Sequence, residues 1–280
     1  MKKHNVGKTI CFSLKILSII STFFSVIALS AIIFYVIKNG IGNLSLSLIF
    51  SESGNKPTIL PAILGTLHLI LISVVIAVPI GVGSAVFLVE YAKNKGKFVK
   101  IISVATETLA GIPSIVYGLF GYLIFVVAFK MGYTILGGGF TLSIMILPLI
   151  VRSTQESLLS VPNGLREGAL ALGTSKVRTI FKVILPSCAS GIVTSIILAI
   201  GRVVSESAVL ILTIGMVTNK MPQNVLMPGT SLALDIYYFA NYGLMKEATA
   251  TSVVLLILVI LINLSANLIG KAIKKRTGEF

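Results

Sequence analysis

Six long apolar stretches constrain this chain more than any other feature of its sequence. A helix needs roughly 20 residues to cross a hydrocarbon core of about 30 Å, and the chain offers close to this length six times. The stretches cover approximately residues 14–37, 63–88, 109–129, 142–159, 188–216 and 251–273. The sequence therefore predicts an all-α, polytopic membrane protein with about six transmembrane helices.

The composition excludes a water-soluble fold. Hydrophobic residues make up 55% of the 280 residues and charged residues only 11%, with a mean hydropathy of +1.01, whereas an average soluble domain has about 25% charged residues. The net charge of +14 does not indicate nucleic-acid binding, because the basic residues occur in short clusters between apolar stretches. We expect membrane lipid, and no nucleic acid, as a partner.

The basic clusters also predict how the chain is oriented, because Lys and Arg collect in the cytoplasmic loops of membrane proteins. The clusters are Lys2, Lys3 and Lys8; Lys93, Lys95, Lys97 and Lys100; Arg166, Lys176, Arg178 and Lys182; and Lys271, Lys274, Lys275 and Arg276. With six crossings these clusters all fall on one side, so both termini are expected in the cytoplasm. The first apolar stretch is too long for the hydrophobic region of a secretory signal, and we expect it to be a retained helix.

Nothing in the sequence indicates chemistry within this chain. Cys11 and Cys188 have no CxxC or histidine partner, which argues against a metal site or a disulfide framework. The GxxxxGK[ST] loop that cradles nucleotide phosphates does not occur. We therefore expect no catalytic residue, metal or cofactor here, and the energy for any transport must come from a partner or a gradient.

The segment at residues 160–186 carries a helical pattern inside the second basic loop. Leu165, Ala169 and Leu172 recur at i, i+4 and i+7, which predicts a short helix with one apolar stripe. Gly173 is typical of a helix end, after which Thr174 or Ser175 can cap a second helix. The apolar residues expected on one face of that second helix are Val177, Ile180, Phe181 and Ile184.

The same segment resembles the EAA loop of ABC importer permeases. That pattern is EAA, three residues, Gly, nine residues and I-x-L-P, and both spacings match at Glu167-Gly168-Ala169, Gly173 and Val183-Ile184-Leu185-Pro186. Gly168 stands for the first Ala, and Val183 stands for Ile. The resemblance implies a coupling helix that docks on a separate ATPase subunit, and the coupling residues that it implies are Arg166, Glu167, Gly168, Ala169 and Gly173.

Most of the chain, about residues 61–276, is similar to permeases of the phosphate-specific PstA type, which have the type I importer (MetI-like) fold. The most specific stretch is Leu109-Ala110-Gly111-Ile112-Pro113-Ser114-Ile115-Val116-Tyr117-Gly118-Leu119, and Glu90-Tyr91-Ala92 also fits. The family's GETAPL-like segment reads Ser205-Glu206-Ser207-Ala208-Val209-Leu210. This departure keeps other oxyanions, such as molybdate or sulfate, open as substrates.

The resemblance also divides the chain into segments. Residues 1–60 would form a cytoplasmic stub, a first transmembrane helix and an extracytoplasmic loop. Residues 61–276 would form the permease domain, with the coupling loop at 160–186, and residues 277–280 a cytoplasmic tail.

Three charged residues within predicted spans are candidates for the substrate pathway: Arg152, Arg202 and Glu206. A charge inside a bilayer is costly and marks a pathway or a buried pair. Arg202 and Glu206, four residues apart, could neutralise each other, and Arg152 could extend to the cytoplasmic face. Residues that break or gate helices are expected at Pro79, Gly111, Pro113 and Ser114, because helix breakers are tolerated in a bundle beside neighbouring helices or a water-filled cavity.

The resemblance implies a set of partners for this chain. These are a second homologous permease subunit, two ATPase subunits that hold ATP and Mg²⁺, and an extracytoplasmic phosphate-binding protein. A gradient-driven secondary transporter is the alternative from a different class of protein.

Overall fold

The computed structural model describes residues 2–50, 58–92 and 96–277, and every regular element in these ranges is helical. The elements are α1 (Lys2–Ile41), α2 (Leu46–Phe50), α3 (Leu60–Val86), η1 (Phe87–Tyr91), α4 (Lys97–Ala110), α5 (Ser114–Gly121), η2 (Tyr122–Ala128), α6 (Ile135–Leu159), α7 (Asn163–Ala171), α8 (Lys176–Thr179), η3 (Ile180–Ile184), α9 (Leu185–Ser187), α10 (Ala189–Val204), α11 (Ala208–Thr213), α12 (Leu232–Asn241) and α13 (Met245–Thr277), where η marks a π-helix. Lys93, Lys95 and residues 278–280, which belong to the predicted basic loop and tail, lie outside the described residues.

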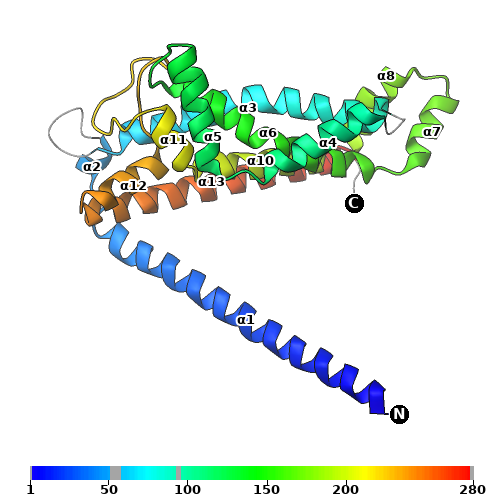
Figure 1. Cartoon of the computed structure of the whole chain (residues 1–280), viewed down its shortest axis with the longest axis horizontal. Coiled ribbons are helices and arrows are strands. Elements are labelled where there is room, and N and C mark those ends of the chain that lie inside the picture. The colour runs from blue at the N-terminus through cyan, green and yellow to red at the C-terminus, as the bar shows by residue number, and fades with distance from the viewer. Residues whose placement is uncertain (1, 51–57, 93–95, 278–280) are drawn as a thin grey trace.

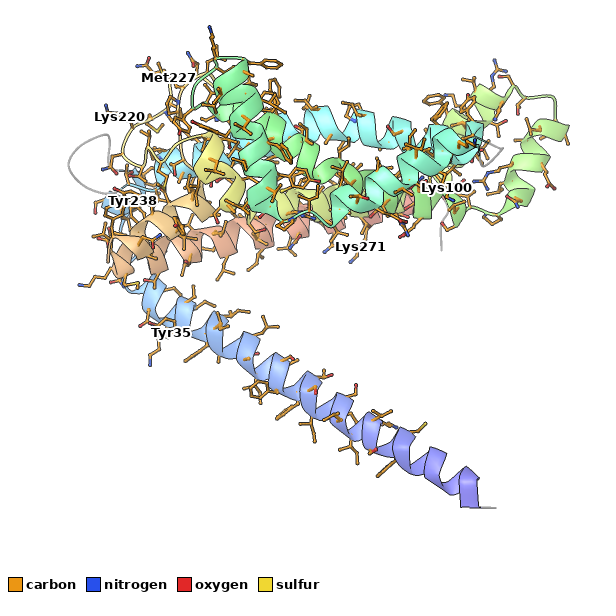
Figure 2. All side chains as sticks on the ribbon, viewed as in Figure 1. Tyr35, Lys100, Lys220, Met227, Tyr238 and Lys271 are labelled. Carbon is orange, nitrogen blue, oxygen red and sulfur yellow. The ribbon has the colours of Figure 1, made fainter. Side chains whose placement is uncertain are left out.

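The long helices α3, α6, α10 and α13 run in a common direction, and the two ends of the bundle that they form differ (Figure 1). Helices α7 and α8 project at one end, whereas α2 and α12 lie at the other. Among the labelled side chains in Figure 2, Lys100 lies toward the end with α7 and α8, while Lys220, Met227 and Tyr238 gather at the opposite end. We call these the α7 end and the α12 end.

The six predicted spans correspond to four continuous helices and two bent pairs. Four helices are long and apolar enough to cross a membrane, namely Cys11–Ile41, Leu60–Tyr91, Ile135–Leu159 and Met245–Lys271. Two helix pairs are apolar enough together but bent: Val99–Ala110 meets Ser114–Ala128 at 104°, and Lys176–Ser187 meets Ala189–Val204 at 67°, which gives up to six spans if each pair is one span. The apolar stretch at residues 109–129 thus contains the break predicted at Gly111, Pro113 and Ser114, and the stretch at residues 188–216 is divided into α10 and α11.

Helices α3 and α6 form the centre of the core, with α10 and α11 against them. Leu69 and Ala77 of α3 are buried, as are Leu142, Ile146 and Ile150 of α6. Contrary to the expectation of a break at Pro79, α3 continues through that residue as a single helix. Its neighbours can support a helix that lacks one backbone hydrogen bond.

Helix α1 leaves the bundle near the α12 end and extends away from it (Figure 1). It packs mainly against α13, where Gly40 faces the backbone of Thr249. Large apolar side chains are exposed from Phe12 to Ile41, including Phe24 and Phe34. A helix that is apolar all round needs lipid or another helix around it.

The second helix of the loop at residues 160–186 differs from the predicted one-sided helix. Ile180 and Ile184 are buried, but Val177 and Phe181 are 54% and 63% exposed. The cause is that residues 180–184 form a π-helix, in which hydrogen bonds join residues five apart. The wider turn shifts each side chain away from the direction that a 3.6-residue period predicts.

Candidate substrate pathway and coupling site

Two helix breaks precede a pair of helices, α5 and α11, that pack on each other. Pro113 has no N–H, and a proline disfavours helical conformation in the residue before it, so α4 ends at Ala110 and α5 begins at Ser114. The second break separates α10 from α11. Helix α5 packs directly on α11: a Cβ added to Gly118 would lie 3.0 Å from the Cα of Val209. The breaks predicted at Gly111, Pro113 and Ser114 thus precede a helix, α5, that packs on α11, the helix that begins just after Glu206.

Arg202 and Glu206 lie on opposite sides of the second break. Helix α10 ends at Val204, and the Ser205 hydroxyl donates a hydrogen bond of 3.0 Å to the Gly201 carbonyl. The Glu206 carboxylate accepts a hydrogen bond of 3.2 Å from the N–H of Val209 and so caps α11. The two side chains form no ion pair in the described structure, because they are not four residues apart on one helix. A direct ion pair therefore does not account for them.

Tyr117 is a member of this region that sequence reasoning did not single out. It is buried, and its hydroxyl donates a hydrogen bond of 2.7 Å to the carbonyl of Leu109, across the bend between α4 and α5. The Arg202 side chain lies within electrostatic range of that hydroxyl. The only sequence signal was its place in the stretch from Leu109 to Leu119.

Arg152 has two carboxylate partners near the α7 end. Its Nη1 lies 2.8 Å from Oε1 of Glu107 on α4, and its Nε lies 3.1 Å from Oε1 of Glu156 on its own helix. The three side chains are 57–67% exposed. Arg152 thus joins α4 to α6.

The predicted coupling helix is α7, and it projects from the bundle (Figure 1). Glu167 and Gly168 are exposed, Ala169 is half-buried, and Leu165, Leu170 and Leu172 are exposed as well. The helix is followed by Gly173 at φ +78°, a conformation that glycine adopts without steric cost. The Ser175 hydroxyl then caps α8 by accepting the N–H of Arg178, as one of the two expected caps would.

Arg166 differs from its neighbours on α7, because its side chain points into the protein. Its Nε and Nη2 both lie 2.9 Å from Oε1 of Glu90, at the end of the helix formed by α3 and η1. Its Nη1 donates to the carbonyl of Val161 and its Nη2 to the carbonyl of Leu158. Sequence reasoning found Glu90 only as part of a family resemblance, because 76 residues separate it from Arg166.

No group of three or more His, Cys, Asp or Glu side chains that could hold a metal ion occurs in residues 2–50, 58–92 and 96–277. Cys188 is buried and Cys11 is exposed, and neither forms a disulfide within the described residues.

A family model and the sequences of known proteins both match this chain. The family model described as the binding-protein-dependent transport system inner membrane component matches residues 77–279. The probable ABC transporter permease protein YqgI of Bacillus subtilis (strain 168) is 36% identical over 261 residues, which cover 86% of this chain and 88% of that protein. The phosphate transport system permease protein PstA of Pasteurella multocida (strain Pm70) is 34% identical over 253 residues, 87% of this chain and 89% of that protein.

Solved structures agree on the fold. A chain of a bacterial alginate ABC transporter, in complex with an alginate pentasaccharide-bound periplasmic protein, superposes with a TM-score of 0.71 at 16% identity, over 94% of this chain and 96% of that one. A chain of the inward-facing MetNI methionine ABC transporter gives a TM-score of 0.62 at 22% identity, over 77% and 94%. Family members are membrane channel subunits and not enzymes themselves. The chain belongs to the family of binding-protein-dependent transport system inner membrane components, as a permease subunit of an ABC importer with the MetI-like fold.

Proposed function

We propose that this permease translocates inorganic phosphate across the cytoplasmic membrane by alternating access, driven by a separate ATPase. The observation that carries the substrate class is Arg202, an arginine within the bundle that Glu206 does not neutralise. Fixed positive charge inside a membrane protein attracts an anion. Relatives named as phosphate transport system permeases support phosphate among the anions.

Passage requires attraction that is strong enough for the anion to enter and weak enough for it to leave. In this proposal Arg202 supplies the attraction, and the nearby carboxylate of Glu206 prevents the anion from being trapped. Gly111, Pro113 and Ser114 form the break at which α4 and α5 can change their relative angle. Arg152 receives the anion nearer the cytoplasm, where Glu107 and Glu156 already balance its charge.

The proposed ATPase partner is indicated by the exposed side chains of α7. Glu167 and the apolar side chains of α7 have no buried position within this chain, which suits a docking surface for an ATPase subunit that carries ATP and Mg²⁺. Two such ATPases and a second homologous permease would complete the channel. An extracytoplasmic phosphate-binding protein would deliver the substrate at the α12 end.

The proposal is tested by uptake of labelled phosphate into proteoliposomes that contain the chain with its co-purifying partners. We expect ATP-dependent uptake that Arg202→Ala abolishes, while the ATPase still co-purifies. Lys271→Ala is the matched loss of an exposed positive charge, and it should leave uptake unchanged.

Three outcomes would contradict the proposal. Normal uptake by Arg202→Ala would remove this residue from the pathway. If molybdate or sulfate inhibits uptake of labelled phosphate at a lower concentration than unlabelled phosphate does, the preferred substrate is another oxyanion, in agreement with the altered segment at residues 205–210. Uptake by the chain alone under an ion gradient would indicate a secondary transporter.

A further inference from the structure

We propose that Glu90 and Arg166 form the link through which movement of the coupling helix reaches the transmembrane bundle. This inference rests on the proposed docking of α7 to an ATPase. It assigns to Glu90 a positioning role: α7 docks on the ATPase, and Glu90 holds α7 on the bundle through Arg166.

The attachment of α7 is polar. No residue of α7 is buried, so apolar packing contributes little to holding this helix on the bundle. Arg166 makes hydrogen bonds to Glu90 at the end of α3–η1 and to the carbonyls of Leu158 and Val161 at the end of α6. A single side chain thereby joins α7 to the ends of the two helices that form the centre of the core.

A second connection reaches the same place from the other side of the loop. Lys176, the first residue of α8, donates from Nζ to the backbone carbonyl of Glu90. The same Nζ lies 4.4 Å from the centre of the Tyr91 ring, within range of a cation–π interaction. The last carbonyls of a helix have no partner within it, which explains why the carbonyl of Glu90 is available.

Burial distinguishes the Glu90–Arg166 pair from the other ion pairs in the described chain. Its side chains are 10% and 18% exposed, whereas those of Arg152 and its partners are 57–67% exposed. Water competes with exposed pairs and makes them weak. Separating a buried pair leaves an uncompensated charge, which is strongly unfavourable. The buried pair therefore keeps one geometry when α7 is displaced.

The helix held by Glu90 reaches the other end of the bundle. Leu60–Tyr91 comprises 32 residues, which corresponds to about 48 Å of helix. Near the α12 end, the hydroxyl of Thr66 accepts the N–H of Leu232 at 3.0 Å. A displacement of Glu90 by α7 is thus passed along a continuous helix toward the opposite membrane face.

The decisive experiment compares Glu90→Gln with wild type in the complex purified with its ATPase and reconstituted in liposomes. Gln keeps the shape of the side chain but not its charge. We expect the ATPase to co-purify in the wild-type ratio and hydrolysis to continue near its normal rate. Labelled phosphate taken up per ATP should fall about tenfold, within the range of measured coupling free energies. Glu247→Gln, a half-exposed carboxylate on α13 near the α12 end, is the matched control.

A second variant addresses the case in which Glu90→Gln is unstable because Arg166 is left unpaired. The double change Glu90→Gln/Arg166→Gln removes both charges, so that no unpaired charge remains buried. We expect it to fold, as judged by size-exclusion chromatography, and still to show low uptake per ATP.

Wild-type uptake per ATP in either variant would overturn the link while leaving the proposed function intact. Absence of any ATPase from the purified wild-type complex would instead refute the proposed function, and the link with it. The ratio of uptake to hydrolysis is the informative measurement, because a merely structural role would lower both quantities together.

Discussion

At the scale of single residues, the buried and half-buried carboxylates differ in the groups with which they form hydrogen bonds or ion pairs. Glu90 pairs with Arg166, and Glu206 caps a helix. Asp235 on α12, outside the candidate spans, accepts a hydrogen bond from the Thr230 hydroxyl, and its second oxygen has no hydrogen-bond partner. Burial raises the pKa of Asp235 from 3.8 to about 8, although the hydrogen bond from Thr230 lowers it in part.

This raised pKa predicts that the free energy of unfolding decreases as the pH rises. Between about pH 4 and pH 8, folded Asp235 holds a proton that the unfolded chain has released. The contribution of Asp235 to stability is therefore complete below the unfolded pKa and is lost as pH rises toward the folded pKa, at up to about 1.4 kcal/mol per pH unit. Asp235→Asn keeps an oxygen for Thr230 but cannot ionise, so its thermal unfolding midpoint should depend less on pH.

The measurement is thermal unfolding of the purified protein in detergent at several pH values between 5 and 8. Thr230→Val, which removes the hydrogen bond but keeps the carboxylate, should retain or steepen the pH dependence. An identical slope in Asp235→Asn and wild type would show that another group titrates.

At the scale of elements, the turn between α7 and α8 sets the shape of the coupling loop. Gly173 has φ +78°, and the Thr174 hydroxyl donates to the carbonyl of Ala169. The turn therefore depends on a backbone conformation that side chains with a Cβ rarely adopt.

Two Gly→Ala substitutions in this loop should have opposite effects. Gly173→Ala forces a Cβ into the left-handed region and should destabilise the loop by about 1–2 kcal/mol. Gly168→Ala lies within α7 with no atom in contact range of the new Cβ, and should stabilise that helix by up to about 1 kcal/mol. Hydrogen exchange of the amides in α7 measures both, and equal protection in the two variants would contradict the prediction.

The sequence predicted the long helices well because continuous apolar runs are local signals. It missed α4, whose apolar residues Ile101 and Val104 alternate with Lys97 and Lys100 in what looked like a basic loop. It also missed the angle between α4 and α5, since Gly111 and Pro113 permit a bend without fixing its direction. The neighbouring helix α11 settles that direction through packing.

The site was predictable only in part for the same reason. Glu167 on α7 and Gly173 just after it belong to a motif with fixed spacing, which can be recognised from the sequence alone. The partners of Arg166 and Arg152, by contrast, come from helices far away in the sequence. The Glu206 cap depends on a helix break that periodicity does not indicate.

At the scale of the whole molecule, the two ends of the bundle should face opposite sides of the membrane. The α7 end carries the basic residues Arg166, Lys176 and Arg178, and the α12 end carries the connection between α11 and α12 (Figure 1). Basic residues are retained on the cytoplasmic side. The α7 end is therefore expected in the cytoplasm.

Single cysteines placed at the two ends test this orientation. In a background with Cys11 and Cys188 replaced by Ala, Leu172→Cys lies at a side chain that is 85% exposed, and Lys220→Cys lies at the α12 end (Figure 2). A membrane-impermeant maleimide should label Leu172→Cys only in inside-out vesicles and Lys220→Cys only in right-side-out vesicles. Labelling of Leu172→Cys from outside would invert the topology and remove α7 from any cytoplasmic ATPase.

The helix that starts at Leu60 has polar attachments near both of its ends and one proline between them. Pro79 cannot donate to the carbonyl four residues earlier, so resistance to curvature is lowest beside it. When α7 pushes the end of this helix that carries Glu90, the contact between Thr66 and Leu232 restrains the other end. The helix is therefore expected to bow at Pro79. Bowing converts a displacement along the helix axis into a sideways displacement of the middle of the helix. Such a displacement can narrow the channel at one membrane face and widen the channel at the opposite face.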